Sequence, residues 1–482
     1  MNCRLMLLST VAFLAAVSLS PSHAQSTKSV TAASIQTKIN AIFPFKGELL
    51  GLFHTMPVDN GFDVVFDTPR LLELLRGIGL RAEGATPLTS RLEPLPDGSF
   101  KIEQEETLSI KGNIAKPQGP LSFYARIDSL KSSAIAEPEL RYLKTAESEM
   151  TNLVVDLQTP TKSSHRTADK WTITQSTSNV ENGRLDLVST SVELGRRDKE
   201  NLESMDVDRI ESTTTIKSLP YRAIQDLFAA WLKQAQDGKP PAAIAGSLRE
   251  EIRMLMPVAT QIDMQGRAEN TRLGQPEFNF GIGSIDYDVV WKDLTRLSNL
   301  DIKLKLEDTD TAGQLQPSYA ALIPDTITVD MSVGGINVQN AWRYYFSTVD
   351  FATPFLLNTY QRNRATSYLV PNDVIPVKVE ELKFNSELYS VRMFGNATYR
   401  IGDSLPKLEL RVITPSLDPL ITHFQKHAKV NPQLGEAAFF ALMAKGFAGK
   451  AGNGWIYWDL AIAEDGRLTV NGHDFTPPRT RP

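Results

Sequence analysis

Two histidines, His423 and His427, stand four residues apart in a stretch whose apolar spacing predicts a helix. Two imidazoles one helical turn apart can share a zinc ion. No carboxylate lies between them to act as the base of a zinc protease, and the intervening Lys426 would repel a cation. We interpret both histidines as residues at the edge of a helix's apolar stripe, and we predict no metal site.

Nucleophilic and phosphate-binding motifs are incomplete in this sequence. Ser284 follows Gly283, but the closing glycine of a nucleophile elbow is missing, which favours a strand containing glycines. The stretch 446–451 contains Gly-Lys, yet Ala451 stands where a phosphate loop needs a hydroxyl, so we expect a helix end there. We predict no catalytic residue and no cofactor.

Carboxylates are the remaining candidates for acid–base chemistry. Most of them fall on the polar side of alternating stretches, where solvation is the ordinary role. A hydrolase that uses two convergent acids stays open as an alternative. The two clusters are Glu103, Glu105 and Glu106, and Asp373, Glu380 and Glu381.

Large aromatic side chains gather in two short stretches, 342–346 and 455–458. In a strand, Trp455 and Tyr457 would point away from the face that carries Ile456 and Trp458. Either both faces of this strand are buried, or one of them contacts an apolar ligand. Our candidate ligand-binding residues are Trp455, Tyr457, Trp342 and Tyr345.

The elements that must position these residues are mainly strands. Apolar and polar residues alternate strictly along 300–307 and 327–333, and similar runs include 62–66, 100–110, 121–127 and 377–399. One dry and one wet face per strand predicts antiparallel sheets. Amphipathic stripes at 224–232 with 244–256, at 417–424 with 435–447, and more loosely within 338–368 predict two or three helix pairs. The predicted fold class is α+β, dominated by long antiparallel sheets that curve or form a groove.

The N-terminus has the three parts of a secretory signal. Arg4 supplies the positive charge, residues 5–19 are apolar, and small residues at Ser22 and Ala24 precede Gln25. We predict a cleaved signal peptide (1–24) and a periplasmic protein. The only cysteine, Cys3, lies within this segment, so thiol chemistry is excluded from the mature chain.

Length and charge limit the remaining possibilities. The predicted domains are a β-rich one at 25–218 and an α+β one at 219–482, with the hydrophilic stretch 196–218 as the boundary. A net charge of −5 argues against a nucleic-acid partner. No apolar stretch after the signal has the length to span a membrane.

The C-terminal segment Asp465–Gly472, with a helix pair and a strand ahead of it, resembles the ending of the YdgA-like and AsmA-like exported bacterial families. The resemblance implies a noncatalytic envelope protein that handles lipid or supports the outer membrane. We therefore hypothesise a periplasmic binding or scaffolding protein that holds a lipid or other apolar ligand in a sheet-lined groove. The alternatives are a carboxylate-dependent hydrolase and a structural subunit that contacts an envelope protein partner.

Overall fold

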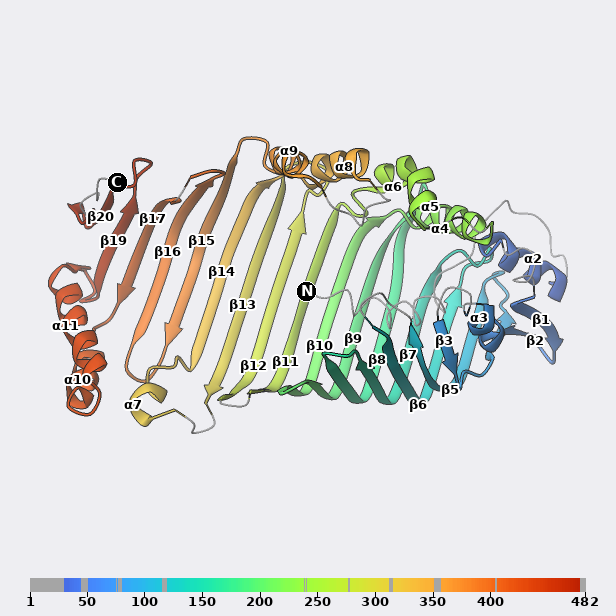
Figure 1. Ribbon diagram of the computed structural model, residues 1–482, viewed down its shortest axis with the longest axis horizontal. Coiled ribbons are helices and arrows are strands. Elements are labelled where there is room, and N and C mark those ends of the chain that lie inside the picture. Colours follow the sequence, from blue (N-terminus) through green and yellow to red (C-terminus); the bar gives the residue numbers. More distant parts are fainter. Residues whose placement is uncertain are drawn as a thin grey trace. The chain divides into compact units, whose positions relative to one another are not determined.

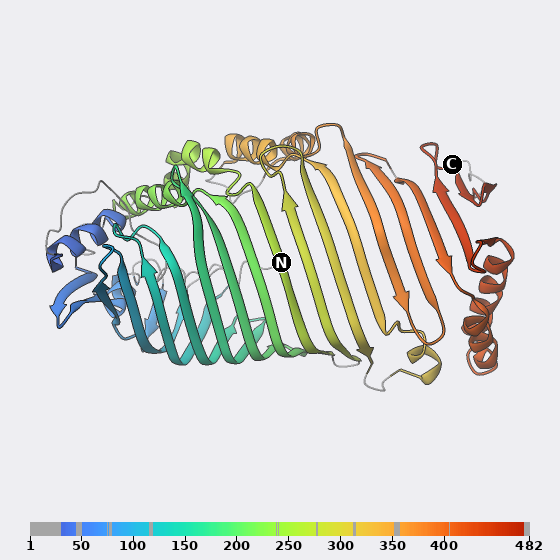
Figure 2. The same ribbon diagram turned by 180° about the vertical axis from the view of Figure 1, so that it is seen from behind.

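The computed structural model describes residues 30–476, apart from 45–50, 75, 77–79, 115–118, 238, 240, 276–277, 312–314, 351–356 and 404 (Figures 1 and 2). The predicted signal peptide therefore lies outside the described residues. Strands take up 53% of the chain and helices 23%, and the strands pair in an antiparallel arrangement. The predicted β-dominated, antiparallel fold class is confirmed.

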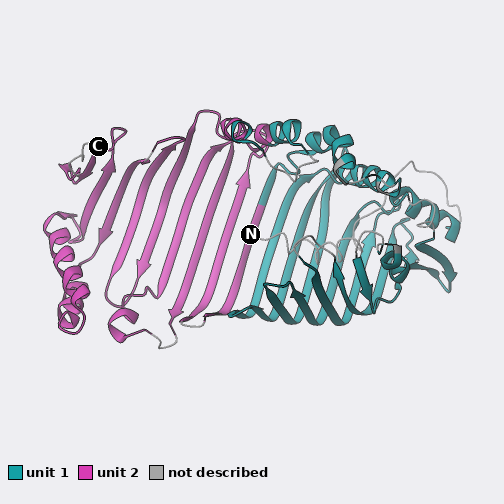
Figure 3. Ribbon diagram, in the orientation of Figure 1, with its two compact units in different colours: residues 1–262, 342–361 teal, residues 263–341, 362–482 magenta. Residues whose placement is uncertain are grey.

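The chain divides into two compact units (Figure 3). Unit 1 comprises residues 1–262 and 342–361, and unit 2 comprises residues 263–341 and 362–482. The hydrophilic stretch 196–218 forms the end of one strand and most of the next, because its alternation continues through the charged residues.

Unit 1 begins with a helix packed on short strands. Ile35, Ile39 and Ile42 of α2 are buried against a cluster that includes Phe62 and Phe100. These first elements are α2 (Ala32–Ile42), β1 (Phe53–Val58), β2 (Gly61–Phe66), α3 (Thr68–Leu74), β3 (Leu80–Glu83) and β4 (Leu88–Pro94). They place a closed apolar core at the start of the sheet.

Six long strands follow in unit 1, each antiparallel to the next: β5 (Phe100–Ile114), β6 (Leu121–Ala136), β7 (Leu143–Gln158), β8 (Ser163–Glu181), β9 (Arg184–Glu200) and β10 (Glu203–Leu219). Each strand from β6 to β10 contains one residue more than a regular two-residue alternation allows. Across this extra residue, side chains on the same face are three positions apart instead of two, as with Met150 and Leu153. The extra residue bends each strand yet keeps its apolar side chains on one face.

Helices follow β10 in unit 1. The stripe at 224–232 forms α4 (Tyr221–Gln236), as predicted. The stripe at 244–256 forms two short helices, α5 (Pro241–Ser247) and α6 (Arg249–Leu255), where we predicted one. Gly246 and Ser247 are weak helix formers, which explains the break. The Arg249 guanidinium donates to backbone carbonyls of Phe346 and Val349, at the end of α8 (Val338–Thr348).

Unit 2 is a second run of antiparallel strands. Its elements are β11 (Gln261–Gln275), β12 (Phe278–Lys292), β13 (Ser298–Asp310), α7 (Pro317–Ala320), β14 (Thr326–Ile336), α9 (Thr359–Leu369), β15 (Val374–Asn385), β16 (Ser390–Arg400), β17 (Lys407–Thr414), α10 (Asp418–His427), α11 (Pro432–Gly446), β18 (Gly449–Lys450), β19 (Ile456–Ile462), β20 (Leu468–Val470) and β21 (His473–Asp474). Pairing runs from β12 in order to β17, then to β19, β20 and β21.

Two turns in unit 2 show how local interactions determine where its strands end. The apolar run 377–399 is a hairpin of β15 and β16 rather than one strand, because Ser386 Oγ accepts backbone hydrogen bonds from Leu388 and Tyr389 and closes a turn. The predicted hairpin at Asp465-Gly466 joins β19 and β20, and Gly466 has a φ of +79°. Glycine adopts that left-handed conformation without steric cost.

Candidate functional site

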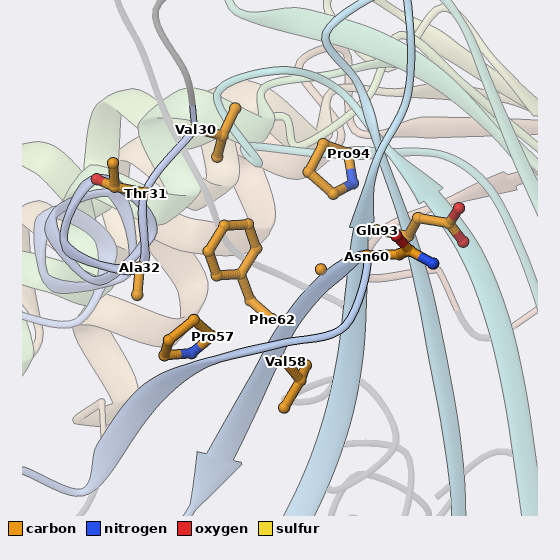
Figure 4. Close-up of a pocket in the computed structure, with 10 residues that line it drawn as sticks. Val30, Thr31, Ala32, Pro57, Val58, Asn60, Phe62, Glu93 and Pro94 are labelled. Carbon is orange, nitrogen blue, oxygen red and sulfur yellow. The ribbon is translucent and has the colours of Figure 1, made fainter.

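A hollow in unit 1 lies between the N-terminus of α2, the β1–β2 hairpin and β4 (Figure 4). Glu93 is the only titratable residue among those that line it: Val30, Thr31, Ala32, Pro57, Val58, Asn60, Gly61, Phe62, Glu93 and Pro94. A single carboxylate has no partner there for paired acid–base work. The hollow therefore gives no support to a hydrolase.

The histidine pair lies on α10 with ring centroids 4.7 Å apart. The Nε2 atom of His423 is 2.9 Å from the backbone carbonyl oxygen of Ser318 in α7, so this ring joins α10 to α7. Among the residues that the structure describes, no group of three His, Cys, Asp or Glu side chains could hold a metal ion.

The other candidate residues lie within strands and helix ends and make ordinary structural contacts. Ser284 lies in the middle of β12, and its Oγ is 3.4 Å from Glu307. Gly446 ends α11, as the sequence predicted. Glu103 pairs with Lys101, Glu105 with Lys131, Glu380 with Lys378 and Glu381 with Arg392. These carboxylates are neutralised by cations on their own or neighbouring strands.

The four aromatic candidates fall into two pairs. Trp342 and Tyr345 lie on α8 in unit 1, with ring centroids 6.3 Å apart. Tyr457 lies on β19 in unit 2 and stacks under the Arg411 guanidinium, 4.8 Å from its ring centroid, and Trp455 precedes that strand. The two pairs belong to different units. In the register of β17 and β19, Tyr457 shares the face that carries charged residues such as Arg411 and Asp459.

The opposite face of the unit 2 sheet is apolar. Residues directly opposite each other on paired strands share a face. From β12 to β16, the register places on this face Ile285, Tyr287, Val289, Trp291, Leu300, Ile302, Leu304, Leu306, Ile327, Val329, Met331, Val333, Val377, Val379, Leu382, Phe384, Val391, Met393, Gly395 and Ala397. We call this set the apolar face of unit 2. It bears no charged side chain.

Charges occupy the other side of the same strands. Lys292 pairs with Asp301, Lys303 with Asp330, and Arg411 with Asp459. Each of these exposed ion pairs contributes little stability. Together they indicate that this side of the sheet faces water. The apolar face is therefore the side available for contact with an apolar partner.

Beyond β16, helices cover the continuation of this side of the sheet. There α10 and α11 pack on β17, β19 and β20, and Leu417, Ile421 and Trp458 become buried. The Trp458 Nε1 donates to the backbone carbonyl of Ala444 in α11 at 2.7 Å. In both views no described helix of unit 2 lies over β12 to β16 (Figures 1 and 2). Of the side chains that make up the apolar face, that of Val379 is buried and the others are half-buried.

The corresponding face of unit 1 is interrupted by charge. Its apolar part is a buried cluster that includes Met150 and Leu153. On β8 and β9, Arg166 donates two hydrogen bonds to Glu193 at 2.8 and 3.0 Å, and Arg196 pairs with Asp198. The Glu193 side chain is only 8% exposed, so this network removes charge from water. A hydrocarbon ligand on this face would therefore contact charged side chains.

The alternation of apolar and polar residues predicted the strands of the apolar face, whereas the four candidate residues were predicted from their large aromatic rings. The alternation along 300–307 and 327–333 already indicated the apolar side chains that count. Their uninterrupted extent across neighbouring strands depends on register, which one sequence does not show.

No protein-family model, no curated protein and no solved structure matches this chain at the significance required. Among the described residues, no helix is both long enough and apolar enough to cross a lipid bilayer. The evidence for a binding site therefore comes from the structure of this chain alone.

Proposed function

We propose that this chain is a noncatalytic binding protein of the cell envelope that holds a hydrocarbon chain of a lipid on the apolar face of unit 2. One observation carries the proposal. The apolar side chains extend without a charge over five paired strands, and no described helix of unit 2 covers them. A continuous apolar surface that the chain leaves partly uncovered is typical of a binding site.

The dimensions fit one acyl chain. Strands in a sheet lie about 4.8 Å apart, so β12 to β16 span roughly 19 Å. A bilayer's hydrocarbon core is about 30 Å thick, so one chain reaches roughly 15 Å. A chain lying across the strands would contact side chains such as Leu304, Val329 and Leu382, which stand opposite one another.

The expected affinity is moderate. Full burial of a methylene contributes about 0.8 kcal/mol, and a chain on an open face is buried on one side only. Ordering the chain and losing its free motion oppose binding. We expect a dissociation constant in the micromolar range or weaker, which suits a protein that exchanges its ligand.

The test compares two adjacent positions of β14. Val329 lies on the apolar face, and Thr328 lies on the opposite face between Lys305 and Lys383. In residues 25–482, Val329→Glu should weaken binding of a dansyl-labelled fatty acid at least tenfold, because the new carboxylate would be desolvated under the ligand. Thr328→Glu adds the same charge and should change binding less than twofold.

Lipid extraction and mass spectrometry of the purified wild-type chain provide a second measurement. Copurifying lipid that Val329→Glu loses would support the proposal. Equal probe binding by the two variants, or no lipid and no probe binding at all in the wild type, would refute it. Circular dichroism and thermal unfolding check that both variants fold.

The periplasmic location is a separate part of the proposal, supported by the signal-like sequence at 1–24. Expression of the full chain in a bacterial host, osmotic-shock fractionation and N-terminal sequencing test it. A mature chain that begins at Gln25 in the periplasmic fraction is the expected result. An unprocessed chain in the cytoplasm would overturn it.

A further inference from the structure

The outer side of α11 is apolar and exposed. Phe439 and Phe440 are 59% and 65% exposed, and Leu442, Met443 and Phe447 are each more than 40% exposed. The inner side of the same helix, through Leu434 and Ala438, is buried. Glu436 is the one charged residue on this outer side, at 200° when Leu434 is placed at zero. A helix side that is otherwise apolar is normally covered. Here packing within unit 2 accounts for one side only.

These five residues form one surface, which we call the α11 patch. At 100° per residue, Phe439, Phe440 and Met443 occupy the helix side opposite Leu434 and Ala438, and Leu442 lies at the edge between the two sides. Phe447 follows at the C-cap, and its ring contacts that of Phe475 with centroids 5.0 Å apart. Side chains that project into solvent to this degree do not enclose a small ligand. The patch is therefore suited to an extended surface.

The charge around the patch is positive. Residues 418–450 contain four lysines and two carboxylates in a chain whose net charge is −5. Lys445 pairs with Asp418. The three other lysines, Lys426, Lys429 and Lys450, are exposed and form no ion pair within the described part of the chain. Exposed apolar side chains in a segment with an excess of lysines are typical of helices that lie in an anionic membrane interface.

We propose that the α11 patch docks unit 2 on the surface of an anionic lipid bilayer. The phenylalanines would enter the boundary between headgroups and acyl chains, and the lysines would attract anionic headgroups. α10 and α11 also cover the continuation of the apolar face of unit 2 beyond β16, through Trp458 (Figure 1). Docking would thus bring the bilayer to the end of the surface that we propose binds hydrocarbon. That role rests on the proposed function, whereas the docking itself does not.

Flotation with vesicles tests the docking. Residues 25–482 should float with vesicles of phosphatidylcholine containing about 30% phosphatidylglycerol, and less with phosphatidylcholine alone. Phe439→Ser with Phe440→Ser should reduce the bound fraction at least tenfold. The control is Met254→Ser with Tyr360→Ser, which removes two comparably exposed large side chains from α6 and α9 and should leave flotation unchanged. Lys429→Gln and Lys450→Gln should each weaken binding to anionic vesicles about fivefold.

Other outcomes overturn the docking. Failure of the wild type to float with either vesicle, or equal flotation of the two double variants, would do so. Light scattering that shows a dimer which Phe439→Ser with Phe440→Ser dissociates would assign the patch to a second copy of the chain instead.

The docking and the proposed function fail separately. Val329→Glu should lose the dansyl fatty acid yet still float with anionic vesicles. The α11 double variant should keep the fatty acid in solution yet no longer float. Loss of both properties in either variant would mean that the two surfaces are not distinct, and would contradict the docking.

Discussion

Units 1 and 2 use the same strand architecture, but their apolar faces differ in composition. In unit 1 the face combines a buried cluster around Met150 and Leu153 with the charge network of Arg166 and Glu193. In unit 2 the face carries no charge from β12 to β16. A ligand on the unit 1 face would have to match or displace ion pairs, whereas the unit 2 face requires only shape and apolarity.

The two apolar faces also differ in how far helices cover them. The ends of both faces are closed by helices, α2 in unit 1 and the pair α10 and α11 in unit 2. Where a helix packs, apolar side chains such as Phe100 and Trp458 are buried. On β12 to β16 of unit 2, where none packs, the strands leave nearly all apolar side chains half-buried. Covering by helices therefore separates core from candidate binding surface in unit 2, whereas in unit 1 strand residues alone bury the cluster around Met150 and Leu153.

The largest effect is expected at the covered end of unit 2. Trp458→Ala removes a buried indole and its hydrogen bond to Ala444. We expect the free energy of unfolding to fall by about 3–5 kcal/mol, as for other buried tryptophans. Urea unfolding followed by circular dichroism measures it. A loss below about 1 kcal/mol would mean that α10 and α11 do not cover this end in solution.

Unit 1 should depend on its charge network nearly as strongly. Glu193→Ala leaves Arg166 and Arg196 without their buried partner. We expect a loss of about 3 kcal/mol, at the low end for a broken buried pair because both guanidiniums keep some contact with water. Glu211→Ala, which breaks an exposed pair with Arg209, should cost less than about 1 kcal/mol. Equal losses in the two variants would show that the network is hydrated.

A smaller effect is expected on the uncovered part of the apolar face. Met331→Ala truncates a half-buried side chain without leaving an enclosed cavity. The free energy of unfolding should fall by about 1 kcal/mol, and fatty-acid binding should weaken a few-fold. The same urea titration applies. A loss of 3 kcal/mol or more would show that something covers this face, and the contrast with Trp458 would disappear.

The smallest effect concerns the turn that leads into the closed core of unit 1. Asp97 accepts hydrogen bonds from Ser99 and lies 3.1 Å from Lys144, and these contacts lower the pKa of its carboxyl from 3.8 to about 2. A lowered folded-state pKa stabilises the fold above pH 3.8, and this contribution is lost as the pH falls toward 2. Asp97→Asn should therefore be less stable than the wild type at pH 5, and the difference should shrink on acidification. A difference that stays constant from pH 5 to pH 2 would contradict this assignment.

Much of the fold could be predicted because its signals are local. Alternation along 300–307 identifies β13 and both of its faces, and Asp465-Gly466 identifies a hairpin. Asn431, which caps α11 by accepting a hydrogen bond from the Gln433 backbone, marks a helix start. The break between α5 and α6 and the hairpin within 377–399 were missed, since short polar interruptions decide both.

The candidate site was only partly predictable. The apolar side chains of β13 and β14 were recognised, but Tyr457 proved to share a face with Arg411 and Asp459. The α11 patch was not recognised. Its signal was present in the sequence, because Phe439 and Phe440 add apolar residues to a helix side that an ordinary amphipathic helix keeps polar.

The order of apolar and polar residues along the chain by itself determined that long antiparallel strands would form. It also determined which side of each strand would face away from water. Side-chain direction alternates with every residue of a strand, so that information is written locally. The tertiary structure alone decided which dry surface is covered and which charges meet, as Arg166 and Glu193 do from neighbouring strands. Burial and ion pairing depend on contacts between residues far apart in the chain, and these exist only once register and helix packing are set.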